Sequence, residues 1–130
     1  MKLNLKYLII FLLLLYFCSD NTVTPTKSMS ELITKKWKVE SSYINGEKNP
    51  WAVTDVFDFR ADSTLVKYEG IGDVILNGIW SIDEINRTLK IKYQNIPSWE
   101  EFFIIKLDEN NLCWTYPWWG KNVEDNLVPF

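Results

Sequence analysis

The 130-residue sequence contains no histidine. Catalytic Ser-His-Asp and Cys-His arrangements need an imidazole as general base, and histidine is the commonest zinc ligand in proteins. Its absence therefore excludes both kinds of nucleophilic site and removes the usual basis for a zinc site. We expect a binding protein rather than an enzyme, with no catalytic residues, no metal and no cofactor.

Positive charge and cysteine are also scarce. Lys and Arg number 14 against 17 Asp and Glu, which gives a net charge of -3. No basic surplus is present for a nucleic-acid partner. Of the two cysteines, Cys18 and Cys113, the second stands between Leu112 and Trp114. Since no histidine is available to activate it, we interpret Cys113 as a small apolar packing residue.

The N-terminus has the pattern of an export signal. Lys2 and Lys6 precede an apolar run over residues 7–17, which is short for a bilayer span. An uncleaved anchor is the alternative. Cys18 follows this run directly and resembles the acylated cysteine of bacterial lipoproteins. That resemblance implies that Cys18 becomes the lipidated mature N-terminus, which would leave Cys113 without a disulfide partner; simple secretion is the alternative.

Three segments follow from this interpretation. Residues 1–18 form the lipoprotein-type signal, the polar residues 19–30 form a flexible tether, and residues 31–130 form one domain. Ser28 or Ser30 is suited to cap a short helical turn before the first strand. We expect a cell-envelope protein held by its lipid at the outer membrane of a Gram-negative-type bacterium, or else a periplasmic or secreted protein.

Aromatic side chains are abundant, with seven Trp, seven Phe and six Tyr. Such residues favour β-strands, because flat rings pack well on a pleated surface. The stretch 55–68 predicts a hairpin in which Phe57 and Phe59 share the buried face. After the turn at 61–63, the apolar pattern is resumed by Leu65, Val66 and Tyr68.

The pattern of strand, turn and strand repeats to the end of the chain. Trp37, Val39 and Ser41 share a face of the first strand, and Asn45-Gly46 predicts a tight turn with positive φ. Four successive apolar residues in 99–107 suggest a strand covered on both faces. Pro117 is expected to end the strand before it. Strands are predicted at about 36–41, 53–60, 64–69, 74–82, 87–94, 99–107 and 112–116, with a last short strand near 122–128 or a strap in its place.

About eight strands with short connections and no intervening helices predict an all-β, up-and-down antiparallel barrel, with a sandwich as the alternative. At this point the chain resembles the lipocalin-like domains of secreted bacterial lipoproteins over residues 32–117. The resemblance rests on Leu32-Ile33-Thr34, on Lys35-Lys36-Trp37-Lys38, and on the segments 57–64, 78–82 and 89–91. It implies an eight-stranded barrel closed at one end, with small apolar ligands bound inside.

An eight-stranded barrel is either filled by its own side chains or holds one small ligand, and both alternatives stay open. If it is hollow, we expect a small apolar or amphipathic ligand, with Tyr93 or Tyr116 offering a hydroxyl. Trp37 and Trp80 either line the cavity or plug the closed end. The predicted interior, ligand-contacting residues are Phe57, Phe59, Trp80, Leu89, Ile91, Tyr93, Phe102, Ile104, Trp114 and Tyr116.

If the barrel is filled, we expect a protein- or glycan-interaction module of the cell envelope that works through a Trp-rich rim. The predicted rim residues are Trp118 and Trp119, and Trp51 and Trp99 stand at strand entries where they would join it. Glu100 and Glu101 are paired acids, but neighbouring residues of a strand point to opposite faces. We therefore interpret them as solvated surface residues and not as a glycosidase pair.

Overall fold

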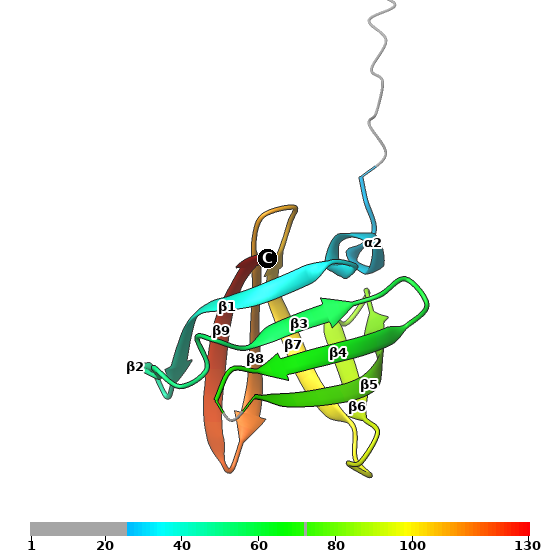
Figure 1. The fold of residues 1–130 in the computed structure, drawn as a ribbon. Coiled ribbons are helices and arrows are strands. Elements are labelled where there is room, and N and C mark those ends of the chain that lie inside the picture. The colour runs from blue at the N-terminus through cyan, green and yellow to red at the C-terminus, as the bar shows by residue number, and fades with distance from the viewer. Residues whose placement is uncertain (1–25, 72) are drawn as a thin grey trace, which may run out of the picture.

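The computed structural model describes residues 26–71 and 73–130. The predicted signal at 1–18 and most of the tether lie outside these ranges. One short helix, α2 (Met29–Ile33), precedes nine strands (Figure 1). The strands are β1 (Lys36–Ile44), β2 (Glu47–Lys48), β3 (Val56–Phe59), β4 (Thr64–Glu69), β5 (Val74–Asp83), β6 (Thr88–Tyr93), β7 (Glu100–Leu107), β8 (Leu112–Trp118) and β9 (Lys121–Pro129).

Eight of these strands form a closed antiparallel barrel. Neighbours in sequence pair with each other from β3 to β9, and β1 pairs with both β3 and β9. The closing register runs from Trp37 opposite Pro129 to Ile44 opposite Val123. The two-residue β2 is an extra strand on β1. The up-and-down barrel of about eight strands is confirmed, and Lys121–Pro129 form its last strand.

The helix α2 lies at one end of the barrel (Figure 1). Ser28 caps it, and the side chain of Glu31 binds the Ser28 backbone N–H in return, which completes a capping box. The indole Nε1 of Trp37 donates a 2.9 Å hydrogen bond to the carbonyl oxygen of Ile33. A five-residue helix has little stability of its own, so it depends on contacts with the barrel: this buried bond, the packing of Ile33 in the core and a hydrogen bond from the Ser30 N–H to Glu84.

Inward-facing residues from the barrel strands form one core, and they alternate with outward-facing residues except where bulges interrupt β1 and β7. β6 shows the pattern most clearly, with Leu89, Ile91 and Tyr93 buried and the lysines between them only partly covered. Aromatic rings form a column through this core, in which Phe59 contacts Trp80 edge-on at 5.7 Å and Phe57 contacts Trp114 at 5.1 Å. Offset and edge-on ring pairs of this kind add stability beyond the area that they bury.

Three local predictions are wrong. A bulge between Val39 and Ser41 places Ser42, instead of Ser41, in the interior. β8 continues through Pro117 to Trp118, because its pairing with β9 extends to the register of Trp118 opposite Lys121. The outer face of β7 is open to solvent: Phe103 and Ile105 are half exposed, since a single-layered barrel wall has only one covered face.

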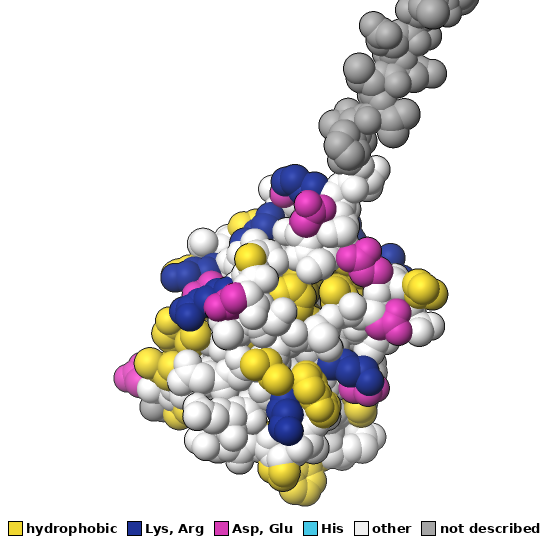
Figure 2. All heavy atoms as spheres, turned by 90° about the vertical axis from the view of Figure 1, so that its right-hand side faces the viewer, with side chains coloured by type: hydrophobic (Ala, Val, Ile, Leu, Met, Phe, Trp, Pro, Cys, Tyr) yellow, Lys and Arg dark blue, Asp and Glu magenta, His cyan; other side chains and the backbone are white. Residues whose placement is uncertain are grey.

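Apolar side chains also occur elsewhere on the outer surface. Ile75 and Ile79 on β5 are about as exposed as the outward residues of β7. Figure 2 shows the apolar side chains of one face in separate groups, interspersed with lysine, arginine and carboxylate side chains. Among the described residues, no helix is long and apolar enough to cross a membrane.

Candidate ligand-binding cavity

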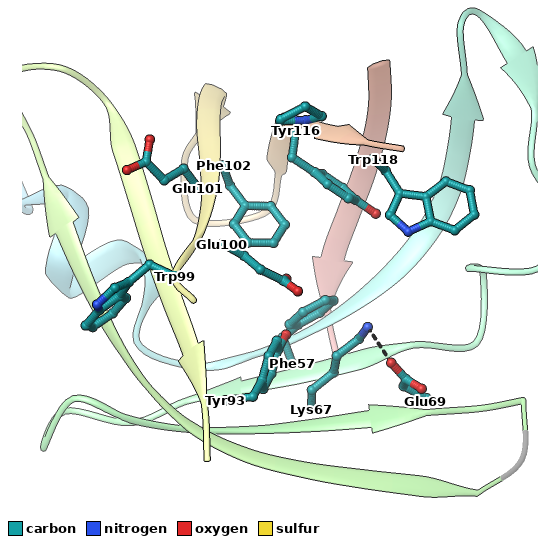
Figure 3. A pocket seen from close by; sticks show the side chains of 11 residues that line it. Phe57, Lys67, Glu69, Tyr93, Trp99, Glu100, Glu101, Phe102, Tyr116 and Trp118 are labelled. Atoms are coloured by element: carbon teal, nitrogen blue, oxygen red, sulfur yellow. Dashed lines mark hydrogen bonds and ion pairs between the residues drawn. The ribbon is translucent and has the colours of Figure 1, made fainter. Parts of the chain in front are cut away.

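A cavity of about 490 Å³ opens at the barrel end away from α2. Its walls come from the last residues of β4, β6 and β8, from the first residues of β7, and from Phe57 of β3 (Figure 3). The volume falls within the range of about 300–1,000 Å³ that is usual for small-molecule sites. The lining residues are Phe57, Lys67, Glu69, Tyr93, Trp99, Glu100, Glu101, Phe102, Tyr116, Pro117 and Trp118.

Four of the predicted interior residues line this cavity: Phe57, Tyr93, Phe102 and Tyr116. Phe102 and Tyr116 come from the paired strands β7 and β8, and their ring centroids lie 4.8 Å apart. Together the four rings give the inner wall an aromatic surface. The same surface is continuous with the ring column of the core through Phe57 and Phe102.

The other six predicted interior residues are buried but do not line the cavity: Phe59, Trp80, Leu89, Ile91, Ile104 and Trp114. Trp80 shows why, since its indole Nε1 donates to the carbonyl oxygens of Arg60 and Thr64, both at 3.1 Å. Its ring is thereby fixed among strand ends at the closed half of the barrel. The interior is thus filled in the half near α2 and hollow in the other half. The two alternatives from the sequence, a filled barrel and a barrel with a cavity, each describe one half.

The hydroxyl groups of Tyr93 and Tyr116 are suited to orient a polar ligand group. Burial is the main cause that raises the pKa of each phenol above its ordinary value. Nearby carboxylates add to the effect, Glu100 for Tyr93 and Asp125 for Tyr116. Both phenols therefore keep their proton and can act as hydrogen-bond donors at physiological pH.

Lys67 is a cavity residue that the sequence interpretation missed. Its ammonium group lies 2.9 Å from Oε1 of Glu69 and 3.4 Å from Oδ2 of Asp55. It also lies 5.3 Å from the ring centroid of Phe57, within the range of a cation–π contact. The signal that would have found it is strand parity: counting by twos from the buried Leu65 gives Lys67 and Glu69 as the inward residues.

Glu100 also points into the cavity, whereas Glu101 points away from it (Figure 3). Partial burial raises the pKa of Glu100; Glu69 raises it further, and Lys67 opposes the shift. Glu101 pairs instead with Lys90 at 3.0 Å on the outer surface. Both acids are exposed, as expected for surface residues, and their opposite directions were also expected; Glu100 differs in that its side chain faces the cavity mouth.

A second hollow, of about 440 Å³, adjoins the first and shares Glu69, Tyr116 and Trp118 with it. Asp55 lines this second hollow. Burial is the largest cause that raises the pKa of Asp55, against the opposing effect of Lys67 and of a 3.3 Å hydrogen bond from the Gly70 backbone N–H. The two hollows thus meet at a group of ionisable side chains.

Tryptophans border both hollows. Trp99 lines the first, Trp51 lines the second, and Trp118 lines both. Trp119 is 88% exposed and belongs to neither. The two predicted rim residues therefore differ: the structure places Trp118 at the cavity mouth and Trp119 on the turn beyond it.

Residues 33–114 match the family model described as a lipocalin-like domain. The chain belongs to the lipocalin-like family. The matched segment contains most of the barrel and three of the four cavity rings, those of Phe57, Tyr93 and Phe102, but it ends before Tyr116 and Trp118. No curated protein matches the chain.

Two solved structures share this lipocalin-like fold. One is a lipocalin-like protein from Bacteroides uniformis, with 13% identity and a TM-score of 0.59, covering 75% of this chain and 97% of that one. The other is a DUF4847 family protein from Bacteroides vulgatus, with 19% identity and a TM-score of 0.54, covering 75% of this chain and 93% of that one. At these identities the likeness concerns the fold alone.

Proposed function

We propose that this lipocalin-like protein is an exported, lipid-anchored binding protein that holds a small amphipathic molecule in the cavity at the open end of its barrel. The observation that carries the proposal is the division of the interior. One half is packed with side chains, and the other contains about 490 Å³ of space lined by aromatic rings and charged side chains. A barrel that served only as a scaffold would gain stability by filling that space.

Binding would result from burial of apolar ligand surface against Phe57, Tyr93, Phe102 and Tyr116. Each Å² of apolar surface removed from water contributes about 25 cal/mol. The phenol hydroxyls and the carboxylates at the mouth would then orient the polar part of the ligand. The role requires no bond to be made or broken, which agrees with a non-enzymatic function.

The lipid anchor is a separate part of the proposal and rests on Cys18 and the apolar run before it. Acylated Cys18, followed by the polar residues up to 30, would tether the barrel to the outer membrane of its bacterium. Metabolic labelling with a clickable fatty acid tests this directly. Label is expected on the wild-type chain and not on the Cys18→Ser variant; label on both, or on neither, would contradict the anchor.

Native mass spectrometry after exposure to a bacterial lipid extract tests the binding function. We expect the full-length protein to retain one small molecule, and Trp118→Ala to lose it because Trp118 borders both hollows. Trp119→Ala is the matched control, since this neighbouring indole lines neither hollow. Retention by neither wild type nor control would reject the cavity as a binding site.

A further inference from the structure

The charged groups at the cavity carry an unbalanced charge. Asp55, Glu69 and Glu100 supply three carboxylates there, and Lys67 supplies one ammonium group. The Lys67 ammonium is already paired with two of the three acids. The site therefore has a surplus of negative charge and no unpaired cation within the described chain to offer to an anionic ligand.

Glu100 is the acid left over. Within the ranges 26–71 and 73–130, no lysine or arginine lies within ion-pair distance of it, although its carboxylate points into the cavity (Figure 3). Partial burial disfavours its charged form. A positive group entering the cavity would relieve that penalty, whereas an anionic group would increase it.

The walls around Glu100 are faces and edges of aromatic rings. Aromatic faces attract cations through the quadrupole of the ring, and a carboxylate beside them strengthens the attraction. The chain itself provides an example, because the Lys67 ammonium lies 5.3 Å from the ring centroid of Phe57 at the cavity floor. Phe102, Tyr93 and Tyr116 offer further rings around the remaining space.

We infer that the ligand of this cavity is an organic cation: an amine or quaternary ammonium group attached to a small apolar body. The cationic group would lie near Glu100, and the apolar part would contact the rings of Phe57, Phe102 and Tyr116. This inference rests on the proposed binding function and specifies its ligand class. It also excludes fatty acids, whose carboxylate would face Glu69 and Glu100.

Three matched probes test the inference by isothermal titration calorimetry on the full-length protein: hexyltrimethylammonium, hexanol and hexanoate. They share an apolar chain and differ in the charge of the head group. The quaternary ammonium is permanently charged, so its own titration cannot confuse the result. We expect hexyltrimethylammonium to bind about tenfold or more tightly than hexanol, and hexanoate to bind most weakly.

Glu100→Gln should remove most of that preference, bringing the cation to within about twofold of hexanol, while the affinity for hexanol itself stays unchanged. Glu40→Gln is the matched control, because this exposed acid on β1 lines neither hollow. Glu69→Gln gives a second measurement if Glu100→Gln does not fold. It should weaken cation binding too, though less, because Glu69 is already paired with Lys67.

The outcomes separate the two proposals. If hexanol or hexanoate binds as tightly as the cation, or if Glu100→Gln leaves the preference intact, the cationic ligand class is wrong and the binding cavity stands. If none of the probes binds to wild type or to the Glu40→Gln control, the binding cavity itself is wrong. Loss of cation binding in both Glu100→Gln and Glu40→Gln would indicate a general effect of surface charge and would also overturn the inference.

Discussion

The indole Nε1 of Trp114 donates a 3.1 Å hydrogen bond to Oδ2 of Asp125 inside the barrel. Both side chains are buried, and they lie opposite each other in the register between β8 and β9. The second carboxylate oxygen, Oδ1, has no hydrogen-bond partner among the described residues. Trp114 therefore supplies the hydrogen bond that Oδ2 of Asp125 accepts, and the Tyr116 hydroxyl also interacts with this carboxylate.

Removing that tryptophan should be costly. We expect Trp114→Phe to lower the free energy of unfolding by about 2–4 kcal/mol, because it deletes ring atoms from the core and removes the indole donor from the Asp125 carboxyl group. Asp125→Asn keeps an oxygen acceptor for the indole and should cost less than about 1 kcal/mol. Urea unfolding of the two variants measures the difference. Equal losses would show that the charge of Asp125, and not the hydrogen bond, is what matters.

Neighbouring isoleucines on β7 should respond very differently to the same substitution. Ile104 is fully buried, so Ile104→Ala should cost about 2–5 kcal/mol through lost burial and the cavity left behind. Ile105 is 47% exposed on the outer face, and Ile105→Ala should cost less than about 1 kcal/mol. Urea unfolding of both variants checks the assignment. A comparable loss for Ile105→Ala would mean that another surface covers the outer face of this strand.

Binding of a permanent cation should depend on pH through Glu100. Partial burial, together with Glu69, raises the pKa of this carboxyl above its ordinary value, and Lys67 opposes the shift. As the pH falls through that raised pKa, Glu100 becomes neutral and the affinity for hexyltrimethylammonium should drop, while Tyr93 stays protonated throughout. Calorimetry at a series of pH values down to about pH 4 gives the profile.

The Glu100→Gln variant provides the comparison for this profile. Its affinity for the cation should be low at every pH, with only the weaker dependence that comes from Asp55. A wild-type profile that is flat, or that parallels the profile of Glu100→Gln, would show that Glu100 does not hold the cation.

Glu100 should also reduce stability at neutral pH. Its pKa in the folded protein is raised above the ordinary value, so the ionised form is less favourable in the fold than in the unfolded chain. The free energy of unfolding therefore decreases as the pH rises from the ordinary pKa of a glutamate to the raised pKa of Glu100 in the folded protein. Glu100→Gln removes this decrease. We expect Glu100→Gln to unfold at higher urea concentration than wild type near pH 7, and the gap to close near about pH 4. A variant less stable than wild type near neutral pH would contradict this.

The barrel was predictable because its signals are local. The alternation of Leu89, Ile91 and Tyr93 and the turn at Asn45-Gly46, whose φ angles are 50° and 83°, both appear in the structure as expected. The inward position of Ser42 was not predictable, because the bulge that produces it depends on pairing with β9 at the far end of the chain. Strand type is a property of a few residues, whereas register depends on the partner strand.

The site was only half predictable for a different reason. The four aromatic rings of the cavity were predicted because burial favours rings and because apolar residues that share one face of a strand indicate the interior. Lys67 and Glu100 were missed because charged residues are normally assigned to the outer surface. In β4, the apolar residues Val66 and Tyr68 also suggested that their own face of the strand, and not that of Lys67, points inward. Strand parity, followed from Leu65 and Phe102, would have placed both charges in the cavity.

The pairing of β1 with β9 has a consequence for how the chain folds. The pairing of β1 can be completed only after β9 has been made, since Trp37 lies opposite Pro129 and the Phe130 backbone N–H donates to the carbonyl oxygen of Lys36. Before β9 pairs with them, β1 and β8 each have an open edge that can pair with another chain. Contacts so distant along the sequence close slowly, so a newly made barrel passes through a stage at which aggregation competes with closure. The residues Lys121–Pro129 end that stage.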